Sequence, residues 1–515
     1  MRLIRLTNEI LGRDERIVLI GRSTTAMSDF FCHQHIVDRV ELLLNDNKRE
    51  QGDVLVDGKS FPVRDFTVLN DPAYGGAGAE YRFIIVDDYY KEVYDELCVV
   101  TSGVAQNLDV YYYLNKENAI EQEYRDKYRD EPLRDIIVFR SGPHPTQYVH
   151  GMDFGDNARA VFEYMLSAGL NEKYELVWIV KDPAEFSRFS GVKNVGFVSF
   201  EWSTDGMPEQ MDEYYRVLCL SKYLFFTDAY GFARNCRDDQ IRIQLWHGCG
   251  FKTRVNFTRC EKRYELMPVI SPAYKEIHKK IYGLRDDQVV ITGYPKADWL
   301  FHPVEQSFTE LFGVPEASRY IMWLPTFRES EGQFSNLNEY SIGKETGLPV
   351  ADTPDKLQRL NELLAEKDTV IIIKLHPFQK RSAVNCDGFS NIVIIENADL
   401  DEMDIPINRI LGKTDALISD YSSAAIDYLI LNRPMGFLLE DVDEYANSRG
   451  FVFDPIRDYI PGAELYDFED MIRFVEELCD GIDSSFGKRQ KVRSKLHSFD
   501  DDRSSERLLK VLGIF

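Results

Sequence analysis

The sequence predicts an α/β protein built on parallel β-sheets. Short runs of β-branched and other apolar residues, each ending at a glycine, a proline or a charged side chain, alternate with segments of helical periodicity. Strands and helices that alternate in this way imply βαβ crossovers, which join parallel strands. The chain has 515 residues, more than one hydrophobic core usually organises, so several α/β units are expected in succession.

The first unit, residues 1–130, is predicted to be a small accessory Rossmann-like domain together with its linker. RIVLIG (16–21) reads as a strand, and FIIVDD (83–88) reads as a second strand that precedes a helical segment. The turn after the first strand, GRSTTAMSDFF, holds one glycine where a dinucleotide-binding loop has three. We therefore expect packing or partner contact here rather than cofactor binding. The charged stretch 115–135 is predicted to be a helical linker.

A second unit, residues 131–312, and a third unit, residues 313–515, repeat the same rhythm of strands and helices. The predicted strands of the second unit are 135–142, 174–182, 223–228, 241–246 and 289–295. Those of the third unit are 320–328, 370–377, 416–423 and 434–440. Two consecutive units of this kind are expected to be parallel-sheet domains with a cleft between them.

Polar side chains follow several of these strands directly: His247, Arg328, His376, Asp420, Ser422 and Ser423. Open α/β sheets bind ligands just beyond the carboxyl ends of their strands, so this placement favours a binding site. Gly248 and Gly250 would let a ligand approach the backbone beside His247, because a β-carbon would block it. The alternatives are structural: a hydrogen-bonded core histidine at 247, a supporting histidine at 376, and helix capping by the serines.

The segment ISDYSSAAIDYL adds a second kind of group to the predicted site. Its two serines open a helix, where backbone N–H groups, hydroxyls and the helix dipole together can hold a phosphate without a lysine. Asp427 comes four residues after Ser423 and therefore lies on the same helix face. It could accept hydrogen bonds from a ribose or polyol hydroxyl, and a solvated or capping carboxylate is the equal alternative.

Composition excludes several classes of protein. The chain holds 61 Lys and Arg against 86 Asp and Glu, and a net charge of −25 argues against a surface that tracks nucleic acid. No apolar run is long enough to span a membrane, and the start shows no signal-peptide core. Eight scattered cysteines without a CxxC pair favour a reducing cytoplasm. No convincing carboxylate cluster for a metal is found, since Asp87–Asp88, Asp238–Asp239 and Asp286–Asp287 are isolated pairs typical of solvated residues, so no metal is predicted. No cofactor is expected either.

Ten short blocks along the chain resemble, in order, those of the CDP-glycerol glycerophosphotransferases, which build teichoic acid and related polyol-phosphate polymers. The resemblance runs from about residue 138 to the C-terminus. The blocks are FGDNARAVFEYM, YELVWIVKDP, LWHG with Lys252, VISPAYKEI, TGYPKADWL, LPTFRES, KLHP, LISDYSSAAIDY with NRP, RGFVFD and SFDDDRSSERLL. The resemblance implies two Rossmann-like domains in the GT-B arrangement, preceded here by the additional N-terminal α/β domain.

The resemblance also implies roles for individual residues. His247 would be the catalytic base, supported by Gly248 and Lys252. His376, placed with it in the catalytic machinery, would hold the donor's phosphates with Arg328, Ser422 and Ser423, and Asp420 and Asp427 would face the donor's polyol, ribose or nucleotide. The family commonly reads Thr-Pro after the His-Gly pair, whereas Cys249 and Gly250 follow here, so the resemblance does not extend to acceptor choice.

The implied reaction moves a polyol phosphate, glycerol phosphate first among the candidates, from a CDP-activated donor to a hydroxyl group and releases CMP. The expected partners are CDP-glycerol or a related CDP-polyol and a lipid-linked or glycan acceptor, at the cytoplasmic face of the membrane and without nucleic acid. Two alternatives stay open. One is a GT-B glycosyltransferase that uses a nucleotide sugar, and the other is a non-catalytic scaffold in a polymer-assembly complex.

Overall fold

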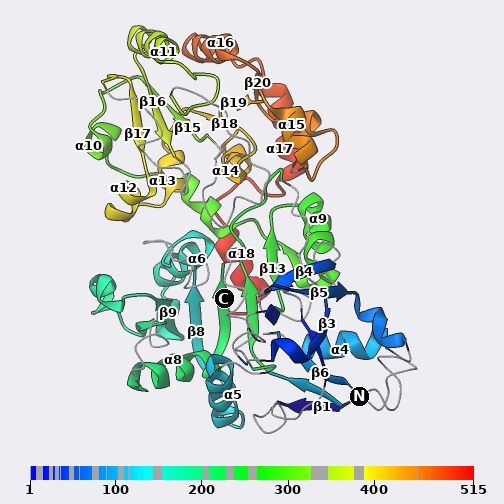
Figure 1. Cartoon of the computed structure of the whole chain (residues 1–515). Coiled ribbons are helices and arrows are strands. Elements are labelled where there is room, and N and C mark those ends of the chain that lie inside the picture. The colour runs from blue at the N-terminus through cyan, green and yellow to red at the C-terminus, as the bar shows by residue number, and fades with distance from the viewer. Residues whose placement is uncertain are drawn as a thin grey trace. The chain divides into compact units, whose positions relative to one another are not determined.

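The chain forms two compact units in a computed structural model. Figure 1 shows the helices and strands of the whole chain. Unit 1 comprises Met1–Pro132, Trp202–Leu220 and Tyr230–Asp238, and unit 2 comprises Leu133–Glu201, Ser221–Ala229 and Asp239–Phe515. The structure describes residues 2–6, 16–21, 27–28, 30, 34, 36–45, 51–56, 58–71, 81–87, 90–101, 109–113, 116–142, 153–200, 208–227, 237–252, 264–325, 346–375, 388–448 and 450–515. The predicted division at 130 and 312 stays a prediction, and unit 1 also takes in two later segments.

Unit 1 is built on a seven-stranded sheet in the order β1-β7-β6-β2-β3-β5-β4. All of its neighbouring strands pair in parallel except β4 and β5, which form an antiparallel pair. The strands are β1 (Arg2–Arg5), β2 (Arg16–Ile20), β3 (Val40–Leu44), β4 (Gly52–Val56), β5 (Lys59–Arg64), β6 (Tyr81–Ile85) and β7 (Asp109–Tyr112). The chain leaves the central strand β2 first toward β3 and later toward β6, which is the Rossmann-like topology that the sequence predicts.

Helices and alternating side chains complete unit 1. Its helical elements are α4 (Tyr90–Val100), α5 (Lys116–Tyr128), α8 (Pro208–Leu220), η1 (Val37–Arg39) and η2 (Phe66–Asn70). Ile17 and Leu19 of β2 enter one buried cluster, whereas Val18 and Ile20 enter another, as the two-residue period of a strand requires. The helix α5 occupies most of the predicted linker and stacks Tyr124 on Tyr215 of α8 at 4.4 Å between ring centroids.

Unit 2 begins with a five-stranded parallel sheet in the order β10-β9-β8-β11-β12. Its strands are β8 (Arg134–Arg140), β9 (Glu175–Val180), β10 (Val195–Ser199), β11 (Ser221–Phe226) and β12 (Ile241–Gln244). The helical elements that follow its strands are α6 (Asp156–Ser167), η4 (Leu170–Glu172) and η5 (Pro183–Phe189). The edge strand β12 delivers the chain directly to Trp246 and His247.

A two-stranded parallel sheet continues from β12. It pairs β13 (Met267–Val269) with β14 (Val289–Ile291), and a parallel bridge between Ile243 and Leu266 joins it to β12. The helical elements around it are α9 (Pro272–Tyr282), η7 (Asp286–Gln288), η8 (Pro295–Phe301) and α10 (Phe308–Phe312). The predicted strand 289–295 is therefore too long, because Gly293 takes a positive φ of 83° and Pro295 begins η8.

The second large sheet of unit 2 has six parallel strands in the order β17-β16-β15-β18-β19-β20. The strands are β15 (Arg319–Trp323), β16 (Thr369–Lys374), β17 (Ile392–Ile395), β18 (Ala416–Ser419), β19 (Met435–Leu438) and β20 (Ala463–Leu465). The helical elements are α11 (Pro354–Glu366), α12 (Asn397–Glu402), α13 (Ile407–Leu411), α14 (Ser423–Tyr428), η10 (Leu429–Leu431), α15 (Val442–Ser448), η11 (Ile456–Tyr459), α16 (Phe468–Cys479), α17 (Phe486–Leu496) and α18 (Ser504–Val511). The predicted mixed α/β architecture with parallel sheets is thus confirmed.

The last helix leaves the six-stranded sheet to which its position in the chain would assign it. Figure 1 shows α18, in red, near α6, on which it packs. Leu508 and Leu509 are fully buried in the core of the five-stranded sheet, together with Trp178 of β9. Asp298 of η8 fixes the start of α18 by accepting hydrogen bonds from the backbone N–H groups of Ser504 and Ser505, both at 2.9 Å. None of the helices in the described part of the chain is long and apolar enough to cross a membrane.

Candidate active site

The backbone that carries His247 turns sharply at the end of β12. Gln244 accepts a hydrogen bond from the Trp246 N–H at 2.9 Å, and Trp246 takes a positive φ of 55°, which is uncommon for any residue other than glycine. The buried amide of Asn157, near the start of α6, donates to the Trp246 carbonyl oxygen at 2.8 Å. The His247 ring is half-buried and stacks on the Trp246 ring at 4.2 Å between centroids. The turn therefore holds the imidazole partly exposed beyond the strand.

Gly248 brings this turn against the first residue of α14. It has a φ of 147°, and a β-carbon placed on it would lie 3.2 Å from both Cβ and Oγ of Ser423. A β-carbon on Gly250 would lie 3.5 Å from the same Cβ. The group that lies close to both glycines is the side chain of Ser423, and the approach of a ligand to this backbone stays a prediction. The structure places His247 and Ser423 at one location, although they are 176 positions apart in the sequence.

The serine pair opens α14 as the sequence predicts. Ser422 is the N-cap, and its Oγ accepts a hydrogen bond from the Ala424 N–H at 3.3 Å. Asp420 is fully buried just after β18. The neighbouring Tyr421 is also buried, and its hydroxyl donates to Asp441 at 3.0 Å. Ser422 thus caps α14, and its contact with a donor phosphate stays a prediction, whereas the side chain of Ser423 lies against the turn that carries His247.

Lys296, at the start of η8, lies beneath the His247 turn. Its side chain is 12% exposed, and Nζ donates to the carbonyl oxygen of His247 while lying 3.3 Å from Asp156 Oδ1 and 3.4 Å from Asp427 Oδ2. Burial lowers the pKa of Lys296, but the two carboxylates outweigh it and raise the pKa above its usual value. The lysine is therefore a cation at neutral pH, held between two acids and one carbonyl group.

Asp427 occupies the buried face of α14. Burial raises its pKa to about 6, Lys296 opposes that rise, and Asp156 adds to it. Within the described residues its Oδ1 atom is buried and has no hydrogen-bond partner, whereas Oδ2 faces Lys296. The alternative interpretation of Asp427 as a solvated carboxylate is thus wrong, since the residue is 2% exposed. Its contact with a donor's polyol or ribose stays a prediction.

Lys252 links the His247 turn to a different block of the sequence. It forms an isolated antiparallel bridge with Phe451, and the Val452 N–H donates to the Phe251 carbonyl oxygen at 2.8 Å. The Lys252 ammonium group lies 5.8 Å from the centroid of the Tyr445 ring. Two blocks that the sequence resemblance relies on, LWHG with Lys252 and RGFVFD, therefore meet in the folded chain.

Two predicted residues, Arg328 and His376, lie outside the described residues. The strands that lead to them are adjacent in the six-stranded sheet, where Trp323 of β15 pairs with Ile373 of β16 and with Ile418 of β18. The described chain after β16 ends at Leu375, whose carbonyl oxygen accepts a hydrogen bond from Lys374 Nζ at 3.0 Å. Burial lowers the pKa of Lys374 to about 8. The roles of Arg328 and His376 stay predictions.

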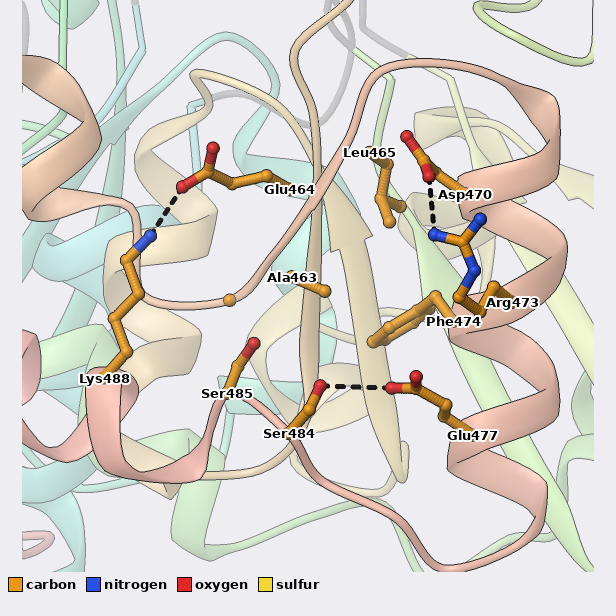
Figure 2. A pocket seen from close by; sticks show the side chains of 11 residues that line it. Ala463, Glu464, Leu465, Asp470, Arg473, Phe474, Glu477, Ser484, Ser485 and Lys488 are labelled. Atoms are coloured by element: carbon orange, nitrogen blue, oxygen red, sulfur yellow. Dashed lines mark hydrogen bonds and ion pairs between the residues drawn. The ribbon is translucent and has the colours of Figure 1, made fainter.

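A hollow elsewhere in unit 2 contains none of the predicted residues. It has a volume of about 330 Å³ and lies beside β20, α16 and α17. Figure 2 shows that its polar side chains face one another: Glu464 pairs with Lys488 at 2.7 Å, Asp470 with Arg473 at 2.9 Å, and Ser484 with Glu477 at 3.1 Å. Most of the charged side chains that line this hollow are thus paired within it.

Three residues of the site were not singled out from the sequence: Asp156, Asn157 and Lys296. The first two stand in the block FGDNARAVFEYM and the third in TGYPKADWL, so the blocks that carry the resemblance contained them. Charged and amide residues in the middle of otherwise buried segments were the available signal. Among the described residues, no group of three His, Cys, Asp or Glu side chains is placed to hold a metal ion.

Comparisons with known proteins identify the family of the chain. A family model described as CDP-glycerol:poly(glycerophosphate) glycerophosphotransferase matches residues 135–513. The teichoic acid ribitol-phosphate polymerases TarK and TarL of Staphylococcus aureus are 28% and 25% identical over 56% and 73% of this chain. The alignments span 56% and 62% of those two proteins. A structure of the wall teichoic acid polymerase TagF, a variant with CDPG, has a similar fold, with a TM-score of 0.57 and 18% identity over 83% of this chain and 96% of that one.

Proposed function

The chain belongs to the CDP-glycerol:poly(glycerophosphate) glycerophosphotransferase family, and on this premise we propose that it transfers a polyol phosphate from a CDP-activated donor to a hydroxyl group of a teichoic-acid-like acceptor. One observation carries the proposal. The His247 turn and the serine that opens α14 lie against each other, with Gly248 and Ser423 in contact distance. A base and a phosphate-holding group are the two parts that such a transfer requires in one place.

The proposed reaction is a displacement at phosphorus. The acceptor oxygen forms a bond to the donor's β-phosphorus, the bond from that phosphorus to the bridging oxygen breaks, and CMP leaves with the bonding electrons. His247 takes the proton of the attacking alcohol, which is a poor nucleophile at neutral pH. Ser422 and Ser423, with Arg328 and His376, would hold the donor's phosphates. Asp420 and Asp427 would lie toward its ribose, polyol or nucleotide. The two large parallel sheets of unit 2 would form the two halves of a GT-B arrangement.

The donor's polyol is glycerol in the proposal. The family is that of the glycerophosphotransferases, and the TagF variant of similar fold was solved with CDPG. TarK and TarL are ribitol-phosphate polymerases, so CDP-ribitol is the alternative donor to be tested. We propose a lipid-linked or glycan acceptor at the cytoplasmic face of the membrane, which the protein would contact peripherally.

Product analysis tests the proposal. Purified protein is supplied with CDP-glycerol, CDP-ribitol or a panel of UDP-sugars, each with a lipid-linked oligomer as acceptor, and the products are identified by mass spectrometry. We expect CMP and an acceptor heavier by one or more glycerol phosphate units. Addition of ribitol phosphate would correct the donor. Release of UDP with transfer of a sugar would establish the glycosyltransferase alternative, and binding of every donor without turnover would favour the scaffold.

A further inference from the structure

Lys296 connects three segments that are far apart in the sequence. Its ammonium group contacts the His247 carbonyl oxygen after β12, Asp156 at the start of α6, and Asp427 in α14. Its backbone N–H donates to Asn157 Oδ1 at 3.0 Å, and the amide nitrogen of Asn157 donates to the Trp246 carbonyl oxygen at 2.8 Å. The peptide groups on both sides of the His247 turn are therefore held, directly or through Asn157, by one residue of η8.

The ammonium group of Lys296 lies close to both the His247 turn and α14. A β-carbon on Gly248 would lie 3.7 Å from Lys296 Nζ and 3.2 Å from Ser423, so the ammonium group and the serine touch the same peptide segment. On its other side the ammonium group faces Asp427, one helical turn beyond Ser423. A single buried charge thus fixes the His247 turn and α14 relative to each other.

Charge balance explains why a lysine occupies this position. The carboxylate of buried Asp427 and that of partly buried Asp156 repel each other, and the ammonium group between them offsets that repulsion while donating to a carbonyl group. A neutral side chain of similar length would fill the space but would leave both acids uncompensated and the His247 carbonyl oxygen without this donor.

We infer that Lys296 is a positioning residue that aims the His247 imidazole at the group held by Ser423. This inference rests on the proposed function, in which His247 is the base. Its role is distinct from stability alone, because the hydrogen bond to the His247 carbonyl sets the orientation of the peptide that carries the imidazole. Misplacement of a base by a fraction of an ångström slows the chemical step more than it weakens donor binding.

A double variant separates positioning from charge compensation. Lys296→Met alone leaves the buried Asp427 and the partly buried Asp156 without their cation, so a loss of folding would be ambiguous. Lys296→Met combined with Asp427→Asn removes one of the acids and is compared with Asp427→Asn alone. We expect the melting temperatures of these two proteins to be similar and kcat of the double variant to be about 10- to 100-fold lower, with KM for CDP-glycerol changed much less. Equal kcat values would overturn the inference.

Two further variants sharpen the test. Lys296→Arg keeps the charge and the donors, and we expect it to recover most of the activity that Lys296→Met loses. Lys413→Met is the matched control, since Lys413 also donates to backbone carbonyl groups, those of Val304, Glu305 and Gln306, but contacts no residue of the site. We expect a lower melting temperature and an unchanged kcat for this control. A loss of kcat as large as that of the double variant would overturn the inference.

Hydrogen exchange keeps this test independent of the proposed function. Wild-type protein that releases no CMP from any donor would refute the proposed function and leave the structural role of Lys296 to be measured directly. Amide exchange of a peptide covering residues 245–252 is followed by mass spectrometry. We expect faster exchange in the double variant than in Asp427→Asn, and no change in Lys413→Met. Identical exchange in the double variant and Asp427→Asn would overturn the inference even if the wild type is active.

Discussion

Gly21 follows β2 in unit 1 and Gly248 follows β12 in unit 2, and the two glycines are small for different reasons. A β-carbon on Gly21 would lie 2.6 Å from the Val86 carbonyl oxygen, which belongs to the neighbouring strand's end in the same sheet. A β-carbon on Gly248 would meet the side chain of Ser423 and approach Lys296, which come from distant segments. Gly21 allows the ends of two neighbouring strands to pack closely, whereas Gly248 allows the His247 turn to pack against Ser423 and Lys296.

The difference shows what a glycine after a strand can and cannot indicate. The local patterns differ: Gly21 comes directly after the apolar run of β2, whereas Leu245, Trp246 and His247 stand between Gly248 and β12, in which apolar and polar residues alternate. Both glycines lie near the carboxyl ends of strands in parallel sheets, where ligands bind. Gly248 stands among groups that can act on a ligand, with the half-buried His247 imidazole beside it and the Lys296–Asp427 ion pair nearby, whereas the described atoms nearest Gly21 are the Val86 carbonyl oxygen and the Met27 side chain. The surroundings, and not the glycine, carry the functional signal.

The largest expected effect tests the imidazole beside Gly248. We predict that His247→Ala lowers kcat at least about 10²-fold with donor affinity little changed, because a base acts mainly in the transition state. CMP release and calorimetric titration of CDP-glycerol measure the two quantities. His302→Ala is the control, since this exposed histidine pairs with Asp502 on the surface at 2.8 Å. A fall in the melting temperature of His247→Ala with turnover per folded molecule intact would make His247 a core histidine instead.

The second effect tests the close approach at Gly248. We predict that Gly248→Ala lowers kcat about 10-fold or more. Alanine rarely adopts the positive φ of this position, and its β-carbon would have to displace Ser423. Gly313→Ala is the matched control: Gly313 also has a positive φ, of 66°, and has no atom within 4 Å of its β-carbon position. The control should cost stability through its backbone and leave turnover unchanged. Equal turnover of the two variants would show that the contact with Ser423 is not required.

The third effect tests whether Gly21 in unit 1 matters only for stability. We predict that Gly21→Ala destabilises unit 1 by about 1–3 kcal/mol, because a backbone carbonyl group cannot move aside as a flexible side chain can. CMP release should stay at the wild-type level at temperatures where unit 1 is folded. Thermal unfolding measured together with CMP release tests both statements. A loss of turnover by the folded protein would show that unit 1 contributes to the chemistry.

The sequence predicted the repeating local features of unit 2 and missed its long-range pairings. Strand periodicity identified β8, β12, β16 and β18, because burial alternates or persists over a few neighbouring residues. It could not identify the contact of Lys296 with Asp156 or Asp427, since these residues are 140 and 131 positions apart (296 minus 156, and 427 minus 296). Nor could it place α18 in the core of the five-stranded sheet, because an amphipathic helix does not specify which apolar surface it covers.

The smallest expected effect concerns the loss of stability at low pH, which should differ between unit 2, where His497 contacts α14, and unit 1. His497, just after α17, donates from Nε2 to the Ile426 carbonyl oxygen of α14 at 2.7 Å, and burial lowers its pKa to about 4. Between about pH 6.5 and pH 4, His497 therefore binds a proton in the unfolded chain but not in the folded chain. The stability that the neutral ring contributes is complete above that pH and is lost as the pH falls toward 4.

We predict that His497→Gln, which keeps a donor for Ile426, lessens the fall in the melting temperature of unit 2 between about pH 6.5 and pH 4. Asp427 acts in the opposite direction, because its raised pKa of about 6 makes unit 2 less stable as the pH rises toward 6. Comparing the variant with the wild type at each pH cancels that contribution, which both proteins share. The transition of unit 1 should be the same in the two proteins, and His302→Gln should leave both transitions unchanged. An equal pH dependence in the variant and the wild type would show that His497 binds its proton alike in the folded and unfolded chains.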